Sequence, residues 1–262
     1  MICAGIDAGS RAIKIILIDT ENMQVIAKGL ADQGVEQDKL SLALFKSVLE
    51  KHGINKKDVA TIVATGYGRN AVSIADTTIT EITCHAVGVH HLLPDSMTII
   101  DIGGQDSKLM RLDNDGRVRD FAMNDRCAAG TGRFLEVVAE RLGVKLEALG
   151  KLAANSTNPA AISSMCVVFA ETEITGLLAS GTAREDIVAG VQASIAARII
   201  SMAGRSAEPP VIFTGGVAMV SGMADAMQNA LGQNVSICPD PQMTGALGAA
   251  ILASKQLKKA NA

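Results

Sequence analysis

Two stretches of this chain repeat one pattern of residues that could bind phosphate. Residues 5–19 read GIDAGSRAIKIILID, residues 99–113 read IIDIGGQDSKLMRLD, and a shift of 94 positions aligns them. The shift pairs Asp7 with Asp101, Gly9 with Gly103, Ser10 with Gly104, Lys14 with Lys108 and Asp19 with Asp113. Glycines in such a turn let backbone N–H groups approach an anion closely, and an aspartate beside them suits a hydrated Mg²⁺. The repeat therefore predicts two loops that bind the phosphates of a nucleotide between them.

An aspartate followed by a glycine also occurs in ordinary tight turns, and a single such turn would favour that explanation. Five aligned pairs in one register favour two related phosphate loops instead. Neither stretch is a P-loop, since GxxxxGK[ST] is absent, and neither continues as GxGxxG. Gln105 in the second loop could orient an attacking water or could be a polar turn residue, and the residue alone leaves both open.

A third glycine turn follows a short apolar strand near the C-terminus, at Thr214, Gly215 and Gly216. Paired glycines after a strand permit close approach of a flat ligand such as adenine, although a tight strand-to-helix turn has the same pattern. Because two phosphate loops precede it in the chain, we interpret this turn as part of a nucleoside site.

Cys127 and Cys166 each stand just ahead of a helical pattern. Unpaired N–H groups and the helix dipole favour a thiolate or an anionic cluster at such places. No CxxC is present, and structural cysteines are common, so a core role and metal ligation both stay open. A tetrahedral thiolate site needs four sulfurs, which two cysteines per chain supply only when two chains meet. Cys3, Cys84 and Cys238 are expected to be small core residues.

Alternating strands and helices must position these residues. Residues 37–52 and 80–92 carry helical patterns, residues 59–65 form an apolar strand, and residues 185–203 form a long helix. Strands that alternate with helices predict an α/β fold. We expect a first lobe of residues 1–95 plus the C-terminal helix 245–262. A second lobe, of residues 96–244, would carry the two cysteines.

Composition limits the classes of protein to consider. The chain has 262 residues, 48% hydrophobic and 19% charged, which indicates a globular protein large enough for two lobes. A net charge of −3 argues against a nucleic-acid-binding surface. No apolar run reaches the roughly 18 residues of a membrane span, and the N-terminus does not resemble a signal peptide. Five cysteines without a secretory signal suggest the reducing cytoplasm.

Six motifs together resemble the ATP-dependent activators of 2-hydroxyacyl-CoA dehydratases. They belong to the actin, Hsp70 and sugar-kinase superfamily, and the ATPase subunits of benzoyl-CoA reductase are their neighbours. The motifs are ATGYGRN (64–70), DIGGQDSK (101–108), NDRCAAGTGRFLEVVA (124–139), SSMCVVFAETE (163–173), FTGGVA (213–218) and GALGAA (245–250). The two cysteine motifs are the most specific part, since kinases of the superfamily lack them.

The resemblance implies a two-lobed actin-like ATPase fold of duplicated ribonuclease H-like domains, with ATP or ADP and Mg²⁺ in the cleft between the lobes. It implies an oxygen-sensitive homodimer bridged by one [4Fe-4S] cluster, ligated by Cys127 and Cys166 from each chain. A ferredoxin or flavodoxin would reduce the cluster, and the electron would pass to a dehydratase, component D. The identity of the acyl-CoA stays open, because an activator need not touch it.

The resemblance also assigns roles to the loop residues. Asp7 and Asp101 would bind Mg²⁺, and Gln105 would position the attacking water. The residues expected at the phosphates are Gly9, Ser10, Arg11, Ala12, Lys14, Gly103, Gly104 and Asp106. Gly215, Gly216 and Gln242 would contact the nucleoside. The first loop reads GSRAIK where the family usually has GSTASK, so Arg11 and Ile13 remove hydroxyl contacts.

Three other functions share parts of this pattern. A small-molecule kinase of the same superfamily would need an acceptor pocket and a catalytic base, and no cluster. A nucleotide-binding sensor would bind ATP and contain no iron. An ATPase subunit of a benzoyl-CoA reductase-like enzyme would have a different partner.

Overall fold

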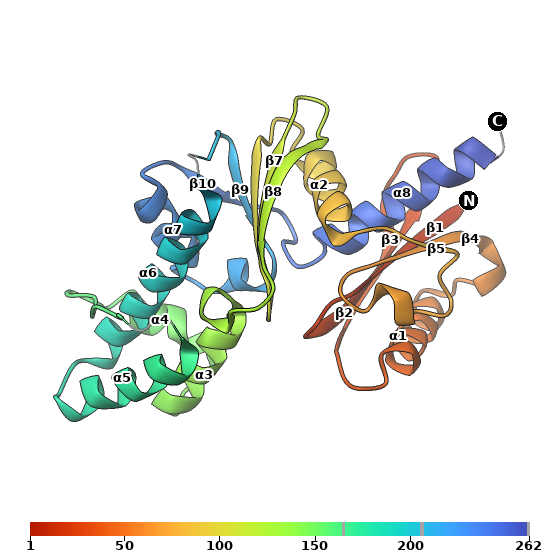
Figure 1. The fold of residues 1–262 in the computed structure, drawn as a ribbon. Helices are drawn as coiled ribbons and strands as arrows, with labels where there is room; N and C mark the ends of the chain where they lie inside the picture. Colours follow the sequence, from red (N-terminus) through yellow and green to blue (C-terminus); the bar gives the residue numbers. More distant parts are fainter. Residues whose placement is uncertain (164–165, 205–206, 261–262) are drawn as a thin grey trace. The chain divides into compact units, whose positions relative to one another are not determined.

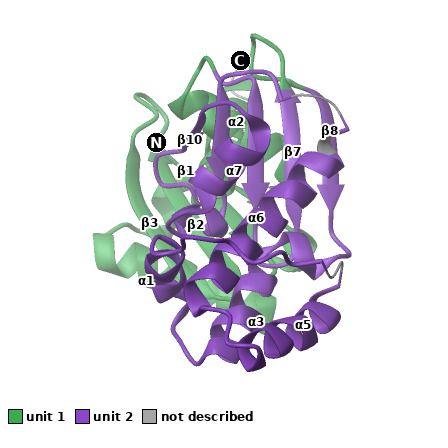
Figure 2. Cartoon of the chain, turned by 90° about the vertical axis from the view of Figure 1, so that its left-hand side faces the viewer, with its two compact units in different colours: residues 1–95, 112–118, 242–262 green, residues 96–111, 119–241 purple. Residues whose placement is uncertain are grey.

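The computed structural model describes residues 1–163, 166–204 and 207–260 (Figure 1). Ser164 and Met165, which belong to the second cysteine motif, lie outside the described residues. The chain forms two compact units (Figure 2). Unit 1 contains residues 1–95, 112–118 and 242–262, and unit 2 contains residues 96–111 and 119–241. None of the helices in the described ranges has the length and apolar character required to cross a membrane.

Unit 1 is built on a five-stranded sheet with the order β3-β2-β1-β4-β5. The strands are β1 (Ile2–Ala8), β2 (Ala12–Asp19), β3 (Val25–Asp32), β4 (Val59–Thr65) and β5 (Thr77–Thr78). The helices are α1 (Gln37–His52), α2 (Glu81–Leu92) and α8 (Thr244–Ala260), with the short turns η1 (Lys56–Asp58) and η2 (Arg69–Ala71). β1 pairs antiparallel with β2 and parallel with β4.

Helices cover both faces of this sheet. Phe45 of α1 packs with Ile6 and Ile15 in one apolar cluster, and α2 and α8 contribute to a second cluster with other residues of β1 and β2. α8 packs backbone on backbone with its neighbours: a Cβ on Gly5 of β1 would collide with the Ala246 carbonyl oxygen, and a Cβ on Gly248 of α8 would collide with the Cys84 carbonyl oxygen of α2.

Unit 2 has a five-stranded sheet with the order β10-β9-β6-β7-β8. The strands are β6 (Thr98–Ile102), β7 (Ser107–Leu112), β8 (Val118–Asn124), β9 (Val211–Thr214) and β10 (Val235–Ile237). The helices are α3 (Gly132–Leu142), α4 (Leu149–Ala153), α5 (Val167–Ala179), α6 (Arg184–Ala203) and α7 (Met223–Leu231). Three short turns are η3 (Ala128–Gly130), η4 (Leu146–Ala148) and η5 (Gly216–Met219).

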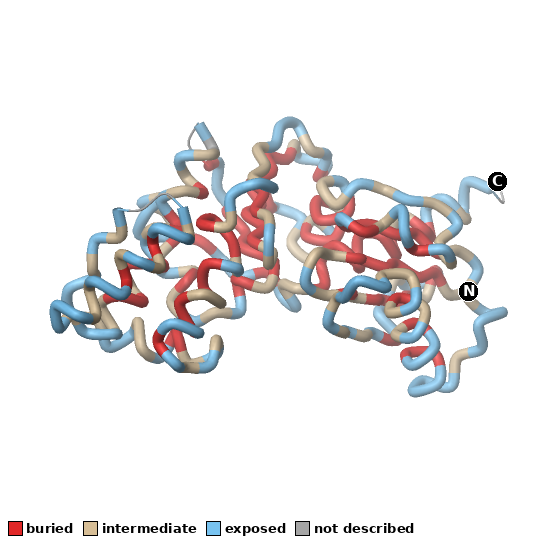
Figure 3. Tube along the Cα trace, turned by 60° about the horizontal axis from the view of Figure 1, so that its bottom comes forward, coloured by how far each residue is buried: buried red, intermediate tan, exposed pale blue. Residues whose placement is uncertain are grey.

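The two sheets share one topology. In unit 2, β6 pairs antiparallel with β7 and parallel with β9, as β1 does with β2 and β4. Read from the opposite end, the order β8-β7-β6-β9-β10 repeats β3-β2-β1-β4-β5. The central strands are buried in both units (Figure 3). The predicted α/β class is confirmed, and the repeat seen in two loops extends to two whole sheets.

Candidate functional site

The first glycine loop connects β1 to β2. Asp7 lies near the end of β1 and is 4% exposed, and the Nζ of Lys14 on β2 is 3.1 Å from its Oδ2. The Gly9 N–H donates to the Ala12 carbonyl oxygen over 3.1 Å and closes the loop. A Cβ on Gly9 would lie 2.8 Å from Lys14 Nζ, so a side chain there would displace the lysine.

The second loop connects β6 to β7 and has the same geometry. Lys108 Nζ lies 3.3 Å from Asp101 Oδ2, and the Gly103 N–H donates to the Asp106 carbonyl oxygen over 2.9 Å. One contact has no counterpart in the first loop, since the Asp106 carboxylate also lies 2.6 Å from Lys108 Nζ. Lys108 is buried between two carboxylates, whereas the repeat alone predicts only one.

A glycine turn lies against each aspartate. Gly66 after β4 and Gly215 after β9 both have φ +88°, a conformation that L side chains rarely adopt. A Cβ on Gly215 would lie 2.7 Å from Asp101 Oδ1, and one on Gly66 would collide with Asp7 Oδ1. Each carboxylate is therefore approached by bare backbone. The sequence predicts a role for Gly215 but none for Gly66, although both glycines follow an apolar strand and a threonine.

The remaining loop residues lie on these turns. Arg11 and Gln105 are exposed at the tips of the two loops, and Gly216 begins η5. Gln242 follows Pro241, whose carbonyl oxygen accepts from the Gly215 N–H over 2.9 Å. In unit 1 the structure places Lys14 and Gly66 beside Asp7, and in unit 2 it places Lys108 and Gly215 beside Asp101.

The cysteines separate into two groups. Cys127 and Cys166 are exposed, whereas Cys3, Cys84 and Cys238 are buried, as predicted for core residues. Burial raises the pKa of the Cys84 thiol to about 12 and that of Cys238 to about 11, and it also raises the pKa of Cys3. The buried thiols are therefore protonated at neutral pH, and two thiols per chain are accessible as ligands.

Cys166 directly precedes α5 as its N-cap, and no side chain caps that helix start. Its place agrees with the predicted start of a helix. Cys127 differs from the prediction, because it caps the three-residue turn η3 and α3 begins only at Gly132. Thr131 is extended, with φ −137° and ψ 172°, and this interrupts the helical pattern. The helix-dipole argument therefore applies to Cys166 and not directly to Cys127.

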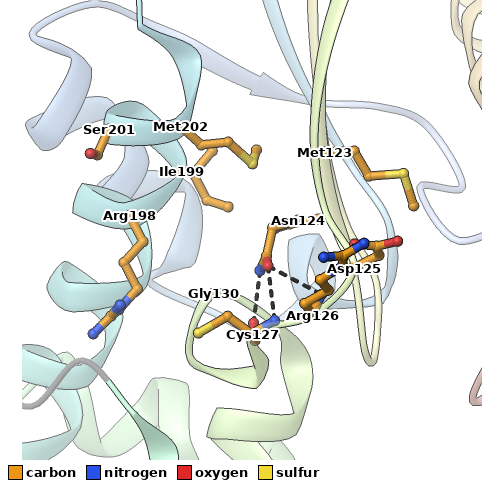
Figure 4. A pocket seen from close by; sticks show the side chains of 11 residues that line it. Met123, Asn124, Asp125, Arg126, Cys127, Gly130, Arg198, Ile199, Ser201 and Met202 are labelled. Atoms are coloured by element: carbon orange, nitrogen blue, oxygen red, sulfur yellow. Dashed lines mark hydrogen bonds and ion pairs between the residues drawn. The ribbon is translucent and has the colours of Figure 1, made fainter.

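Cys127 lines a cavity of about 590 Å³ between the end of β8, η3 and α6 (Figure 4). The side chain of Asn124, the last residue of β8, binds both backbone groups of Cys127. Arg198 and Ser107 line the same cavity. Ser107 is the first residue of β7 and directly follows the second glycine loop.

Two hydrogen bonds join the second glycine loop to the segment that carries Cys127. The Gly132 N–H donates to the Gly103 carbonyl oxygen, and the Arg133 N–H donates to the Gly104 carbonyl oxygen, each over 2.9 Å. Gly132 is tightly packed there, since a Cβ would lie 3.1 Å from the Gly103 oxygen. The sequence did not reveal this contact, because no spacing rule links residues 103 and 132.

The residues present suit a shared thiolate-ligated metal group better than a site within one chain. Among the described residues, no three of His, Cys, Asp or Glu come together as a metal site. The two accessible thiols of each chain would supply half of a four-sulfur ligand set. The N–H groups at the start of α5 would stabilise negative charge beside Cys166.

Solved structures identify the fold. The activator of the 2-hydroxyisocaproyl-CoA dehydratase from Clostridium difficile with bound ADPNP is 41% identical, covers 100% of this chain and 97% of that chain, and has a TM-score of 0.93. A ROK family glucokinase from Streptomyces griseus shares the fold at 14% identity, with a TM-score of 0.60 over 97% of this chain and 100% of that chain. The architecture is therefore the actin-like ATPase fold that the sequence resemblance implied.

Sequence relatives identify the family. The activator of lactoyl-CoA dehydratase of Anaerotignum propionicum is 44% identical over 260 residues, covering 99% of this chain and 100% of that protein. Residues 4–253 match the BadF/BadG/BcrA/BcrD ATPase family, and the chain belongs to this family.

Proposed function

We propose that this ATPase activates a 2-hydroxyacyl-CoA dehydratase by giving it one low-potential electron. The names of its relatives support the dehydratase as partner. The observation that carries the proposal is the pair of hydrogen bonds from Gly132 and Arg133 to the carbonyls of Gly103 and Gly104. They join a phosphate loop to the segment that holds Cys127.

ATP and Mg²⁺ bind at the two glycine loops in this proposal. Asp7 and Asp101 hold the waters of Mg²⁺, as carboxylates beside phosphate loops do. The backbone N–H groups of both loops and the side chains of Arg11 and Lys14 contact phosphate, and Gln105 positions the attacking water. The remaining proposed contacts are Gly9, Ser10, Ala12, Gly103, Gly104 and Asp106 at the phosphates and Gly215, Gly216 and Gln242 at the nucleoside.

Cys127 and Cys166 of two chains together ligate one [4Fe-4S] cluster in the proposed homodimer. When bound, the cluster supplies one-electron transfer at low potential. The chain contributes thiolates, and the N–H groups and dipole of α5 stabilise their negative charge at Cys166. A ferredoxin or flavodoxin is the proposed electron donor. We place the protein in the cytoplasm, where thiols stay reduced.

ATP hydrolysis changes the position of Cys127 through the second loop. ATP and ADP differ in what they contact at Gly103 and Gly104, so they favour different positions of the α3 start and of Cys127. A ligand can shift such an equilibrium only by its differential affinity for the two states. The short path from Gly103 to Gly132 lets that difference reach Cys127.

Anaerobic purification tests the proposal. We expect a brown homodimer with about four iron and four sulfide per two chains. Cys127→Ser and Cys166→Ser should each abolish bound iron, while Cys238→Ala, which removes a buried thiol, should retain it. An iron-free protein that hydrolyses ATP without phosphorylating an acceptor would instead indicate a nucleotide sensor. Phosphorylation of a sugar or acid would indicate a kinase, and copurification with a benzoyl-CoA reductase-like enzyme would change the partner.

A further inference from the structure

We propose that Asn124 is a positioning residue for Cys127, and that it sets the orientation and the electrostatic surroundings of this thiolate. The inference rests on the proposed ligand role of Cys127. Asn124 acts through the backbone of Cys127, to which its side chain is hydrogen-bonded.

The Asn124 side chain holds both polar groups of the Cys127 backbone. Its Oδ1 accepts from the Cys127 N–H over 2.9 Å, and its Nδ2 donates to the Cys127 carbonyl oxygen over 2.7 Å (Figure 4). A weaker bond of 3.4 Å runs from the Arg126 N–H to the same Oδ1. Two bonds to one residue fix the peptide planes on either side of it, and hence the direction of its Cα–Cβ bond.

The surroundings of Asn124 restrict its own position. It ends β8, so its backbone belongs to the sheet. A Cβ on Gly130 would lie 3.4 Å from Asn124 Nδ2 and 3.7 Å from Ser107 Oγ, so the amide fills a space that Gly130 leaves open. The two bonds from Asn124 therefore hold Cys127 at the end of β8.

A neutral amide is the side chain that suits this place. It supplies both an acceptor and a donor, and it adds no negative charge beside a thiolate. A carboxylate of the same shape would keep the acceptor and lose the donor. It would also face the Cys127 carbonyl oxygen with like partial charge. Asn124→Asp thus removes only the hydrogen bond to the Cys127 carbonyl oxygen, whereas Asn124→Ala removes both bonds to Cys127.

The test compares these variants with Asn22→Ala in the anaerobically purified protein. Asn22 Oδ1 accepts from the Gln24 N–H over 2.9 Å in an exposed turn of unit 1, so it controls for loss of a similar turn contact. We expect Asn124→Ala to release iron to a chelator about tenfold faster, as loss of an outer contact to a metal ligand typically does. Asn124→Asp should retain iron better than Asn124→Ala and lower the midpoint potential of the cluster.

Two further readouts distinguish positioning from loss of structure. The electron paramagnetic resonance spectrum of the reduced cluster should change in both Asn124 variants and not in Asn22→Ala. In cluster-free protein, iodoacetamide should label Cys127 at a changed rate relative to Cys166 in the same chain. Unaltered iron release, spectrum and labelling in both variants would overturn the inference. If Cys127→Ser itself left the iron content unchanged, the proposed function would fail instead.

Discussion

The two glycine loops stand on equivalent strands of equivalent sheets, yet they are held differently. In unit 1, Lys14 pairs with Asp7, and its side chain is 16% exposed. In unit 2, Lys108 lies between Asp101 and Asp106 and its side chain is 4% exposed. The residue of the first loop that aligns with Asp106 is Ala12, which has no carboxylate. This one difference within the repeat gives Lys108 a second carboxylate partner. We call the second loop braced because Asp101 and Asp106 both hold Lys108.

The second loop is also tied on its other side, through Gly132 and Arg133 to the segment with Cys127. We infer a division of labour between the units. In the proposed function, both loops bind phosphate, and the second also passes the change from ATP to ADP to the segment that carries Cys127. The contacts of Lys108 make the second loop stiff. A displacement of Gly103 on a change of nucleotide is therefore passed on to Gly132 and is less readily absorbed within the loop.

The largest expected effect tests the brace itself. Lys108→Met leaves two carboxylates without their buried cation, which should lower the free energy of unfolding by about 3–5 kcal/mol. Lys14→Met should cost clearly less, because Lys14 is more exposed and leaves one carboxylate. Urea unfolding measures both. Adding Asp106→Asn to Lys108→Met should restore part of the loss, and equal losses for the two lysine variants would contradict the comparison.

The second prediction concerns Asp7 and Asp101, which occupy aligned positions in the two loops. Asp7→Asn and Asp101→Asn should each lower the rate of ATP hydrolysis by roughly 10²-fold, the usual cost of removing one electrostatic contact from an active site. Steady-state hydrolysis at varied Mg²⁺ concentration measures this. Asp19→Asn and Asp113→Asn are matched controls, since both residues accept backbone hydrogen bonds in turns. An unchanged rate of hydrolysis in either loop variant would show that its aspartate does not bind Mg²⁺.

A third prediction compares the buried thiols of the two units. Burial raises the pKa of Cys84 in unit 1 to about 12 and that of Cys238 in unit 2 to about 11. Above about pH 8.5 the unfolded chain loses these protons while the folded chain keeps them. Stability should therefore fall as pH rises from about 9 toward 12, by at most about 1.4 kcal/mol per pH unit for Cys84.

Unfolding at pH 9, 10, 11 and 12 checks this slope. Between pH 11 and 12, Cys84→Ala should flatten it more than Cys238→Ala does, because the folded-state pKa of Cys84 is the higher one. A slope that neither variant changes would show that other groups control the alkaline stability.

The smallest expected effect concerns the link between the second loop and α3. Gly132→Ala places a Cβ 3.1 Å from the Gly103 oxygen, so the loop must shift by a few tenths of an ångström. Affinity for ADPNP should weaken roughly threefold, within the range of mutations that act along a coupled path. Gly176→Ala is the control, because a Cβ there meets nothing within 4 Å. Equal affinities of Gly132→Ala and the unchanged protein for ADPNP, measured by calorimetry, would show that Gly132 does not influence nucleotide binding.

The sequence predicts the parts of this molecule that follow a local period. The helical pattern over residues 37–52 and the apolar run over 59–65 match α1 and β4. The burial of Cys84 agrees with the prediction of a core residue, whereas for Cys127 a core role and metal ligation both stay open in the sequence, and the structure exposes it. Cys127 stands ahead of a helical pattern in the sequence, and in the structure the turn η3 and extended Thr131 separate it from the start of α3 at Gly132.

Contacts between distant positions escape such patterns. The Asn124 side chain binds the backbone of Cys127, and the Gly132 N–H binds the carbonyl oxygen of Gly103. Backbone groups are the same in every residue type, so the sequence does not indicate these contacts. His85 shows the same limit. It lies four residues after Glu81 and suggests a surface pair, yet it is buried with Nδ1 2.9 Å from Thr244 Oγ1, while Glu81 pairs with Arg69. Partners from other elements, brought close by the fold, decide these cases.

The most direct test of the account measures iron release from the anaerobically purified protein in the presence of ADP and of ADPNP. If the second loop passes the nucleotide state to Cys127, the rates of release to a chelator should differ at least about fivefold between the two nucleotides. Equal rates with saturating ADP and ADPNP, in protein that holds iron, would contradict the account.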